Sequence, residues 1–340
     1  MIKIFVTRRI PENGLAMLRE KGFTLVLSEK PRPLSKRELI KELKKNPYDA
    51  VLCLLTDTID KDVFDAAPSA KIFANFAVGF NNIALEEAKK RGIVITNTPG
   101  ASTESVSEFT LALILNVARR VNEGDRFMRA GKFKGWGPPM FGRDIKGMTL
   151  GIVGSGRIGA EIAKKALRGF EMKVIAYSPH RDTKASKKLR FKYVALNNLL
   201  KNSDIISINC PLNKQTHHLI NMRTIRKIKK GGYLINTARG GIVDNTALLY
   251  ALDKKILAGA GLDVLEGEEE IKEEKELLRK KMSREERSCL AEIHKLLGKR
   301  NVVITPHSAF YSREALQRIR DTTLENIFGF LRGKVRNRVA

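Results

Sequence analysis

The sequence predicts an α/β protein with two doubly wound parallel-sheet domains. Short apolar runs alternate with amphipathic helical stretches along most of the 340 residues, as in strands joined by helical crossovers. A glycine-rich turn joins one such run to one such stretch near the middle of the chain. The chain is also long enough to form two separate hydrophobic cores.

The first hundred residues contain five apolar runs that we expect to be parallel strands. Helical stretches such as residues 35–45 and 85–91 separate them, and a break at Asn97-Thr98-Pro99-Gly100 precedes a long helix that begins near Ser102. The Ser, Thr and Glu residues at that point suit a helix cap. The five runs are residues 2–6, 24–27, 50–54, 71–76 and 93–95.

Strand and helix patterns alternate again in the second half, after a Gly/Pro-rich turn at residues 135–139. A charge-dense block at residues 266–300 predicts surface helices. The apolar stripe of residues 313–331 predicts a closing helix. The expected strands are residues 149–153, 174–177, 205–208, 233–236, 258–262 and 302–304, and two further helices are expected at residues 221–229 and 245–252.

The turn GSGRIG at residues 154–159 has the context of a dinucleotide-binding fingerprint. It follows one predicted strand, opens a helix and precedes a second strand within ~30 residues. Gly154 permits the tight turn, Gly156 lets a pyrophosphate approach the backbone, and Gly159 lets the helix pack on the strand. The helix N-terminus offers N–H groups and a positive dipole end to phosphates. We therefore expect a Rossmann domain that binds NAD(H) or NADP(H).

The residue that normally selects NAD is absent from its usual position. An acid ~20 residues after the glycines binds the ribose 2′-hydroxyl in NAD enzymes, but Ser178 stands there. His180 and Arg181 follow and could bind a 2′-phosphate. Alternatively these residues are solvated, and Asp182 or a backbone group serves the ribose. The sequence is therefore compatible with both NAD(H) and NADP(H).

Composition predicts a cytoplasmic protein with no membrane partner. No apolar run reaches the ~18–20 residues that span a bilayer, and three widely spaced cysteines give no disulfide or metal pattern. The net charge of +26 is scattered along the chain, which favours a general basic bias over a specific nucleic-acid surface.

Three predicted strand ends carry residues of catalytic type. Arg239 follows the strand at 233–236, carboxylates follow the strand at 258–262, and His307 follows the last strand. In open α/β sheets ligands bind at that edge. Hydride reduction of a 2-keto acid needs a cation for the carboxylate and carbonyl, a proton donor, and a group that tunes the donor.

With these motifs the chain resembles the D-isomer-specific 2-hydroxyacid dehydrogenases over essentially its whole length, and its last hundred residues are most similar to fermentative D-lactate dehydrogenase. By that resemblance Arg239 binds the substrate carboxylate and polarises the carbonyl, His307 is the acid–base group, and Glu268, five residues after Asp263, is its partner. Glu266, Glu269 and Glu270 are then expected to be solvated. The motifs are FAVGFNNI (76–83), NTPGASTESVSEF (97–109), GIVGSGRIG (151–159), INTARGGIVD (235–244), GLDVLEGE (261–268) and TPHSAFYSREAL (305–316).

The resemblance also implies the binding residues. The backbone of Val78 and Gly79 would clasp the substrate carboxylate. The alternative role of Cys210 is that of a small buried apolar residue. The His217-His218 pair has no partner at metal-ligand spacing and is expected on the surface. Besides the fingerprint glycines and Arg181, the implied cofactor contacts are Arg157, Ile158, Ser178, Cys210, Pro211, Thr216, Thr237, Ala238 and Asp263.

The family fold implies that the chain crosses twice between its domains. Residues 1–100 and 309–340 would form a flavodoxin-like substrate-binding domain, and residues 101–308 the NAD(P)-binding Rossmann domain, with substrate in the cleft between them. The resemblance further implies a homodimer in which the helix after Ser102 contributes to the interface.

Phe310 and Tyr311 bear on the substrate, because aromatic residues after the histidine would narrow the pocket. They favour a small 2-keto acid, pyruvate with D-lactate as product, and the alternative is a glyoxylate or hydroxypyruvate reductase. A second alternative is a dinucleotide-sensing scaffold like the corepressor relatives of the family. A scaffold has no need of Arg239, Glu268 and His307 together, which favours the enzyme.

Overall fold

The computed structural model describes residues 2–10, 12–133, 141–268 and 283–340. It contains two compact α/β units, one formed by residues 1–102 with 311–340 and the other by residues 103–310. The predicted turn at 135–139 lies outside the described residues, as do Glu269 and Glu270. In the part of the chain that is described, no helix is long and apolar enough to cross a membrane.

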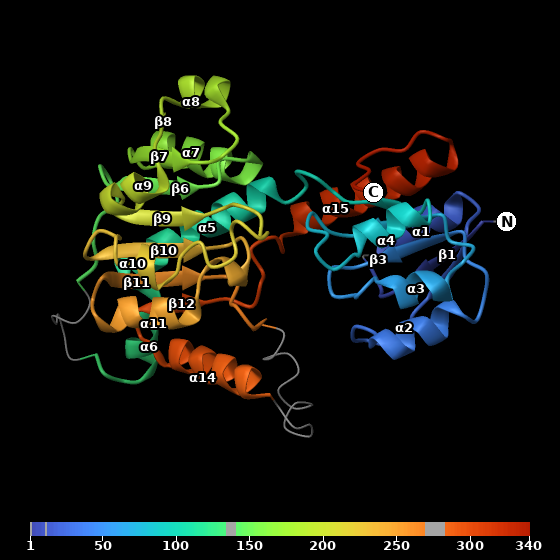
Figure 1. Ribbon diagram of the computed structural model, residues 1–340, viewed down its shortest axis with the longest axis horizontal. Helices are drawn as coiled ribbons and strands as arrows, with labels where there is room; N and C mark the ends of the chain where they lie inside the picture. Colours follow the sequence, from blue (N-terminus) through green and yellow to red (C-terminus); the bar gives the residue numbers. More distant parts are fainter. Residues whose placement is uncertain (1, 11, 134–140, 269–282) are drawn as a thin grey trace. The chain divides into compact units, whose positions relative to one another are not determined.

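The first unit is built on a five-stranded parallel sheet with the strand order β2-β1-β3-β4-β5, of which β1 and β3 are labelled in Figure 1. This is the flavodoxin-like doubly wound order, in which crossover helices cover both faces. Every residue of β3 and β4 is buried, as the continuous apolar runs predicted. The strands are β1 (Lys3–Val6), β2 (Thr24–Leu27), β3 (Ala50–Cys53), β4 (Ile72–Asn75) and β5 (Val94–Thr96).

The last helix of the chain completes this first unit. Helix α15 (Arg313–Leu331) packs against β4 and against α1 (Glu12–Glu20). Its fully buried Asn326 donates a 2.8 Å hydrogen bond to the carbonyl of Asn97. The remaining helices of the unit are α2 (Lys36–Leu43), α3 (Lys61–Ala66) and α4 (Leu85–Lys90).

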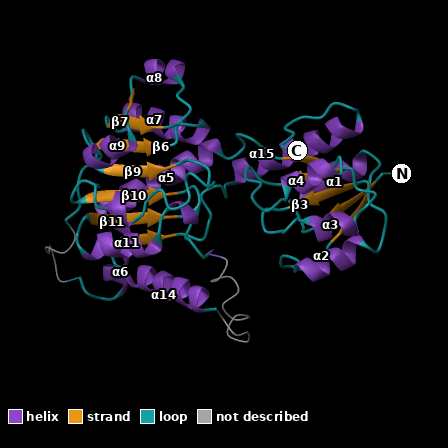
Figure 2. Ribbon diagram, in the orientation of Figure 1, coloured by secondary structure: helices purple, strands orange, loops and turns teal. Residues whose placement is uncertain are grey.

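The second unit contains a seven-stranded sheet with the order β12-β11-β10-β9-β6-β7-β8, and its recorded pairings are all parallel (Figure 2). The order reverses between β6 and β9, which is the switch point where doubly wound sheets bind dinucleotides. The strands are β6 (Thr149–Val153), β7 (Lys173–Tyr177), β8 (Lys192–Tyr193), β9 (Ile205–Ile208), β10 (Gly232–Asn236), β11 (Leu257–Leu262) and β12 (Val302–Ile304).

Helices pack on this sheet around two large apolar clusters. Helix α5 (Thr103–Arg119) contacts α7 (Arg157–Gly169) and the central strands β10 and β11. Of the predicted charged block, residues 284–298 form helix α14. The other described helices are α6 (Val121–Arg129), α8 (Thr183–Leu189), α9 (Leu196–Asn202), α10 (Met222–Ile225) and α11 (Asn245–Asp253).

This topology brings the motif residues to one edge of the second sheet. The fingerprint turn follows β6, Cys210 comes two residues after β9, and Arg239 comes three residues after β10. Residues 263–268 follow β11, and His307 follows β12. Because these strands are parallel neighbours, their carboxyl ends meet at the same edge.

Candidate active site

Two of the three fingerprint glycines are required by close contacts, and the third faces open space. Gly154 has a φ of +94°, and a Cβ there would lie 2.6 Å from the backbone nitrogen of Cys210. A Cβ at Gly159 would lie 2.1 Å from the carbonyl oxygen of Gly154, so the helix packs directly on the turn. Gly156 instead has open space, with nothing within 4 Å of the same position.

That open space suits a dinucleotide pyrophosphate. Gly156 is the N-cap of α7 and provides no side-chain cap, so the first N–H groups of the helix need an outside acceptor. Arg157 is exposed beside it, and Ile158 is half-buried. The residues present therefore fit the phosphates of a nicotinamide dinucleotide.

The end of β7, where a ribose would lie, carries no free acid. The hydroxyl of Ser178 donates a 2.8 Å hydrogen bond to the carbonyl of His180. Asp182 caps α8 by accepting a 2.9 Å bond from the backbone of Ala185. Arg181 is exposed, and its guanidinium lies 5.8 Å from the ring centre of Tyr193.

A cavity of about 610 Å³ opens beside this strand end. Tyr177, Arg181, Arg223 and Lys227 are among its lining residues. Three cationic side chains around one cavity would attract an anionic group.

The loop after β9 is held by its own polar groups. The hydroxyl of Thr216 donates a 2.6 Å bond to the carbonyl of Pro211, which directly follows the buried Cys210 in the chain. Burial raises the pKa of the Cys210 thiol to about 11. The thiol is therefore neutral at ordinary pH and acts as a small apolar side chain.

The end of β10 presents Arg239. Its carbonyl accepts a 2.9 Å bond from the Asn236 side chain, whose oxygen accepts a 3.1 Å bond from the Ala238 nitrogen. Thr237 bonds through its hydroxyl to Thr110, at 2.9 Å. Burial lowers the pKa of Arg239, and the charge of Glu268 acts in the opposite direction; a guanidinium remains protonated in either case.

Asp263, at the end of β11, fixes the segment that carries His307. Its buried carboxylate accepts hydrogen bonds from the Thr305 hydroxyl at 2.6 Å, the Ser308 nitrogen at 2.9 Å and the Ala309 nitrogen at 2.8 Å. Its carbonyl also accepts a 2.9 Å bond from the His307 nitrogen. Burial raises the pKa of Asp263, while these hydrogen bonds and the neighbouring His307 act to lower it.

His307 and Glu268 form a pair at this edge. The Nδ1 atom of His307 lies 2.8 Å from Oε1 of Glu268, and the side chains are 23% and 24% exposed, so solvent or a ligand can reach both. The backbone of His307 is left-handed, with a φ of +53°. The ring of Phe310 stands edge-on at 6.4 Å between ring centres. With Nδ1 bonded to the carboxylate, Nε2 is the ring atom available to a substrate.

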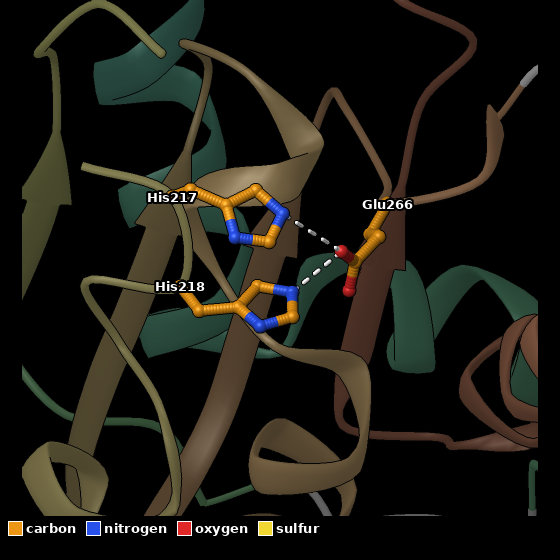
Figure 3. A group of neighbouring side chains, drawn as sticks. All are labelled: His217, His218 and Glu266. Carbon is orange, nitrogen blue, oxygen red and sulfur yellow. Dashed lines mark hydrogen bonds and ion pairs between the residues drawn. The ribbon is translucent and has the colours of Figure 1, made fainter. Parts of the chain in front are cut away.

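Glu266 does not lie free in solvent, contrary to the expectation from sequence. Its carboxylate bonds to Nε2 of His218 at 2.5 Å and lies 3.9 Å from Nε2 of His217 (Figure 3). His217 is exposed, as expected, whereas His218 is partly buried. The pair of histidines therefore does have a carboxylate partner, which reaches it from another loop.

The remaining predicted substrate residues belong to the first unit or to its boundary. The carbonyls of Val78 and Gly79 each accept a 2.8 Å bond, from the side chains of Asn97 and Asn75 respectively. Neither asparagine was given a site role from the sequence, although Asn75 ends strand β4 and Asn97 directly follows strand β5. Tyr311 begins the second segment of the unit and is 68% exposed.

Comparison with known proteins identifies the family. Residues 111–309 match the family model described as the NAD binding domain of D-isomer specific 2-hydroxyacid dehydrogenases. The chain belongs to this family. It is therefore a D-2-hydroxyacid dehydrogenase that uses a nicotinamide dinucleotide, and its two parallel sheets are those of solved members.

Similar proteins match this dehydrogenase over nearly its full length. A glyoxylate reductase of Korarchaeum cryptofilum is 43% identical over 335 residues, covering 98% of this chain and 94% of the relative. A glyoxylate reductase of Thermococcus litoralis is 41% identical over 338 residues, covering 98% and 95%. The crystal structure of D-lactate dehydrogenase from Aquifex aeolicus, complexed with NAD and lactic acid, has a TM-score of 0.82 and 34% identity, covering 98% of this chain and 96% of that one.

We predict that Asp263→Asn weakens this dehydrogenase through the His307 segment. An amide offers one acceptor oxygen, so at least one of the three donors loses its partner, which costs about 1–3 kcal/mol. The free energy of unfolding in urea should fall by that amount, and kcat should fall more than dinucleotide affinity. The exposed Asp253→Asn is the matched control. Loss of dinucleotide affinity alone would contradict this role for Asp263.

Proposed function

We propose that this dehydrogenase reduces a small 2-keto acid to the D-2-hydroxy acid, using NADH or NADPH. The observation that carries the proposal is the His307–Glu268 pair, 2.8 Å between Nδ1 and Oε1, together with the half-buried cation Arg239, whose pKa the charge of Glu268 influences. Val78 and Gly79 are proposed to bind the substrate carboxylate through their N–H groups, which can donate to an anion, while Asn97 and Asn75 hold their carbonyls in place.

Each side chain has one proposed task. Arg239 binds the keto-acid carboxylate and polarises the carbonyl, which gains negative charge during reduction. His307, protonated and held by Glu268, gives its Nε2 proton to the carbonyl oxygen. The reduced nicotinamide, when bound, supplies the hydride to the carbonyl carbon. In the oxidative direction neutral His307 takes the hydroxyl proton.

Two substrates are supported by different observations. The archaeal relatives that are 41–43% identical over 98% of the chain are named glyoxylate reductases, which favours glyoxylate. The aromatic residues Phe310 and Tyr311 and the likeness to the Aquifex aeolicus enzyme favour pyruvate. We propose that both are accepted and that glyoxylate is preferred, since pockets discriminate a methyl group by only ~1–3 kcal/mol.

The proposed cofactor contacts are the fingerprint glycines and the residues around them. Two features favour acceptance of NADPH as well as NADH. Ser178 stands where NAD-specific enzymes have an acid, and the adjacent cavity is lined by the cations Arg181, Arg223 and Lys227. Arg157, Ile158, Cys210, Pro211, Thr216, Thr237, Ala238 and Asp263 complete the proposed contacts. We further propose a cytoplasmic homodimer with α5 at its interface.

A panel of 2-keto acids with NADH and NADPH tests this function. We expect oxidation of either cofactor with glyoxylate and with pyruvate, and the D-product from pyruvate. His307→Ala should lower kcat by roughly 10²–10⁴, as for loss of a general acid, with dinucleotide affinity kept. Tight dinucleotide binding without turnover of any 2-keto acid would favour the corepressor-like scaffold instead.

We predict that Glu268→Gln lowers kcat for keto-acid reduction more than it changes dinucleotide affinity. The Glu268 carboxylate lies 2.8 Å from Nδ1 of His307 and holds the ring for the proposed proton transfer, whereas an amide keeps the shape and removes the charge. The measurement is kcat with the keto acid saturating, beside the dissociation constant of the dinucleotide. Glu266→Gln, whose parent carboxylate bonds to His218, is the matched control. An equal loss of kcat in both variants would contradict the assignment of Glu268.

We predict that Ser178→Asp shifts cofactor preference toward NADH. A carboxylate at the end of β7 can accept bonds from the ribose hydroxyls and repels a 2′-phosphate. The ratio of kcat/KM for NADPH to that for NADH should fall at least about tenfold, the equivalent of 1.4 kcal/mol. Ser178→Ala, which removes the hydroxyl without adding charge, separates the two effects. An unchanged ratio would mean that the ribose lies elsewhere.

A further inference from the structure

The geometry points to a binding site for a zinc-class divalent cation formed by His217, His218 and Glu266 (Figure 3). The two rings and the carboxylate come from different loops, the first after β9 and the second after β11. Each residue offers one ligand atom, and all three atoms lie within 4.8 Å of one another. The site is independent of the proposed substrate.

The backbone orients the two histidines toward the same place. Neighbouring side chains in an extended chain point to opposite sides, but His218 has a left-handed φ of +48°. The rings are stacked, with centres 4.0 Å apart and planes 25° apart. Both Nε2 atoms therefore approach the same carboxylate oxygen of Glu266, at 2.5 and 3.9 Å.

The donor set suits zinc. Two imidazole nitrogens and a carboxylate oxygen are ligands of Zn²⁺ at ~2.0–2.2 Å, which puts ligand atoms about 3.4 Å apart in a tetrahedron. The two observed Nε2–Oε1 distances, 2.5 and 3.9 Å, lie below and above that separation. Small rotations of the side chains would bring the ligand atoms to it. Zn²⁺ would replace the proton that His218 and Glu266 share, and the carboxylate offsets part of the metal charge. Three protein ligands leave a fourth position for water.

The three side chains are accessible to solvent, and hydrogen bonds already hold the backbone of both loops. The side chains of His217, His218 and Glu266 are 57%, 35% and 27% exposed, so an ion can enter without unfolding the unit. The His218 nitrogen donates a 2.9 Å bond to Gly241, and the Asn245 side chain donates a 3.1 Å bond to the Glu266 carbonyl. Bound zinc would therefore join two loops that are held near one another without it.

The alternative is that the His218–Glu266 bond only fastens the two loops. His217→Ala distinguishes the two roles, because it removes one ligand and leaves that bond intact. His217 is exposed, so this variant should fold. Its circular dichroism and its free energy of unfolding in urea verify the fold.

The test is titration of the chelator-stripped full chain with Zn²⁺ against a chromophoric zinc indicator. We expect one ion per chain, binding weakened at least about tenfold by His217→Ala and by Glu266→Gln, and unchanged binding in His180→Ala. Co²⁺ should give the strong visible absorption of a tetrahedral site in the parent chain and not in His217→Ala.

Three results would overturn the site. The first is the absence of stoichiometric binding, and the second is stoichiometric binding that His217→Ala leaves unchanged. The third is binding that His307→Ala abolishes and Glu266→Gln does not, which would move the ion to the His307–Glu268 pair. None of these results bears on turnover of keto acids by the metal-free protein, so the two proposals fail separately.

Discussion

The carboxylate of Asp263 fixes the backbone on which the candidate chemistry depends. It ends β11 in a buried position and accepts three hydrogen bonds from residues 305–309, the segment that follows the neighbouring strand β12. A buried carboxylate is unfavourable unless its oxygens are bonded, and burial does raise the pKa of Asp263. The bonds offset that cost, and they hold His307 in a left-handed conformation that few residues adopt unaided.

The same strand end also supplies the partner of His307. The chain continues from Asp263 through a short turn to Glu268, whose carboxylate returns to the ring at 2.8 Å. Backbone and side chain of the histidine are therefore both positioned from β11. Because β10 is the next strand in the sheet, Arg239 is brought to the same edge, and the charge of Glu268 influences the pKa of Arg239.

Features encoded within a short stretch of sequence could be predicted, and features that depend on distant segments could not. The apolar runs predicted eleven strands that the structure contains, each within two residues at its ends. They missed β8, which has two residues, and α8, whose sequence TKASKKL has no apolar stripe. The resemblance selected Glu268 by counting from Asp263, and the structure brings it to His307; their catalytic roles stay predictions.

The contacts of Asp263 and Glu266 join residues more than 40 positions apart. No local sequence pattern predicts such contacts, because these residues come close together only when β9, β11 and β12 take their places in the sheet. For this reason the His217-His218 pair was interpreted as having no partner. The sequence likewise did not predict that the Asp263 carboxylate binds residues 305–309, and its expected contact with the cofactor stays a prediction.

The turn between Asp263 and Glu268 connects the His307–Glu268 pair with the proposed cation site. A Cβ at Gly240 would lie 2.0 Å from the Leu265 carbonyl, so the turn packs directly on the chain that follows Arg239. The Glu266 carbonyl is held by Asn245, which leaves its carboxylate to rotate while the backbone stays in place. A cation can therefore replace the proton between His218 and Glu266 without moving Glu268.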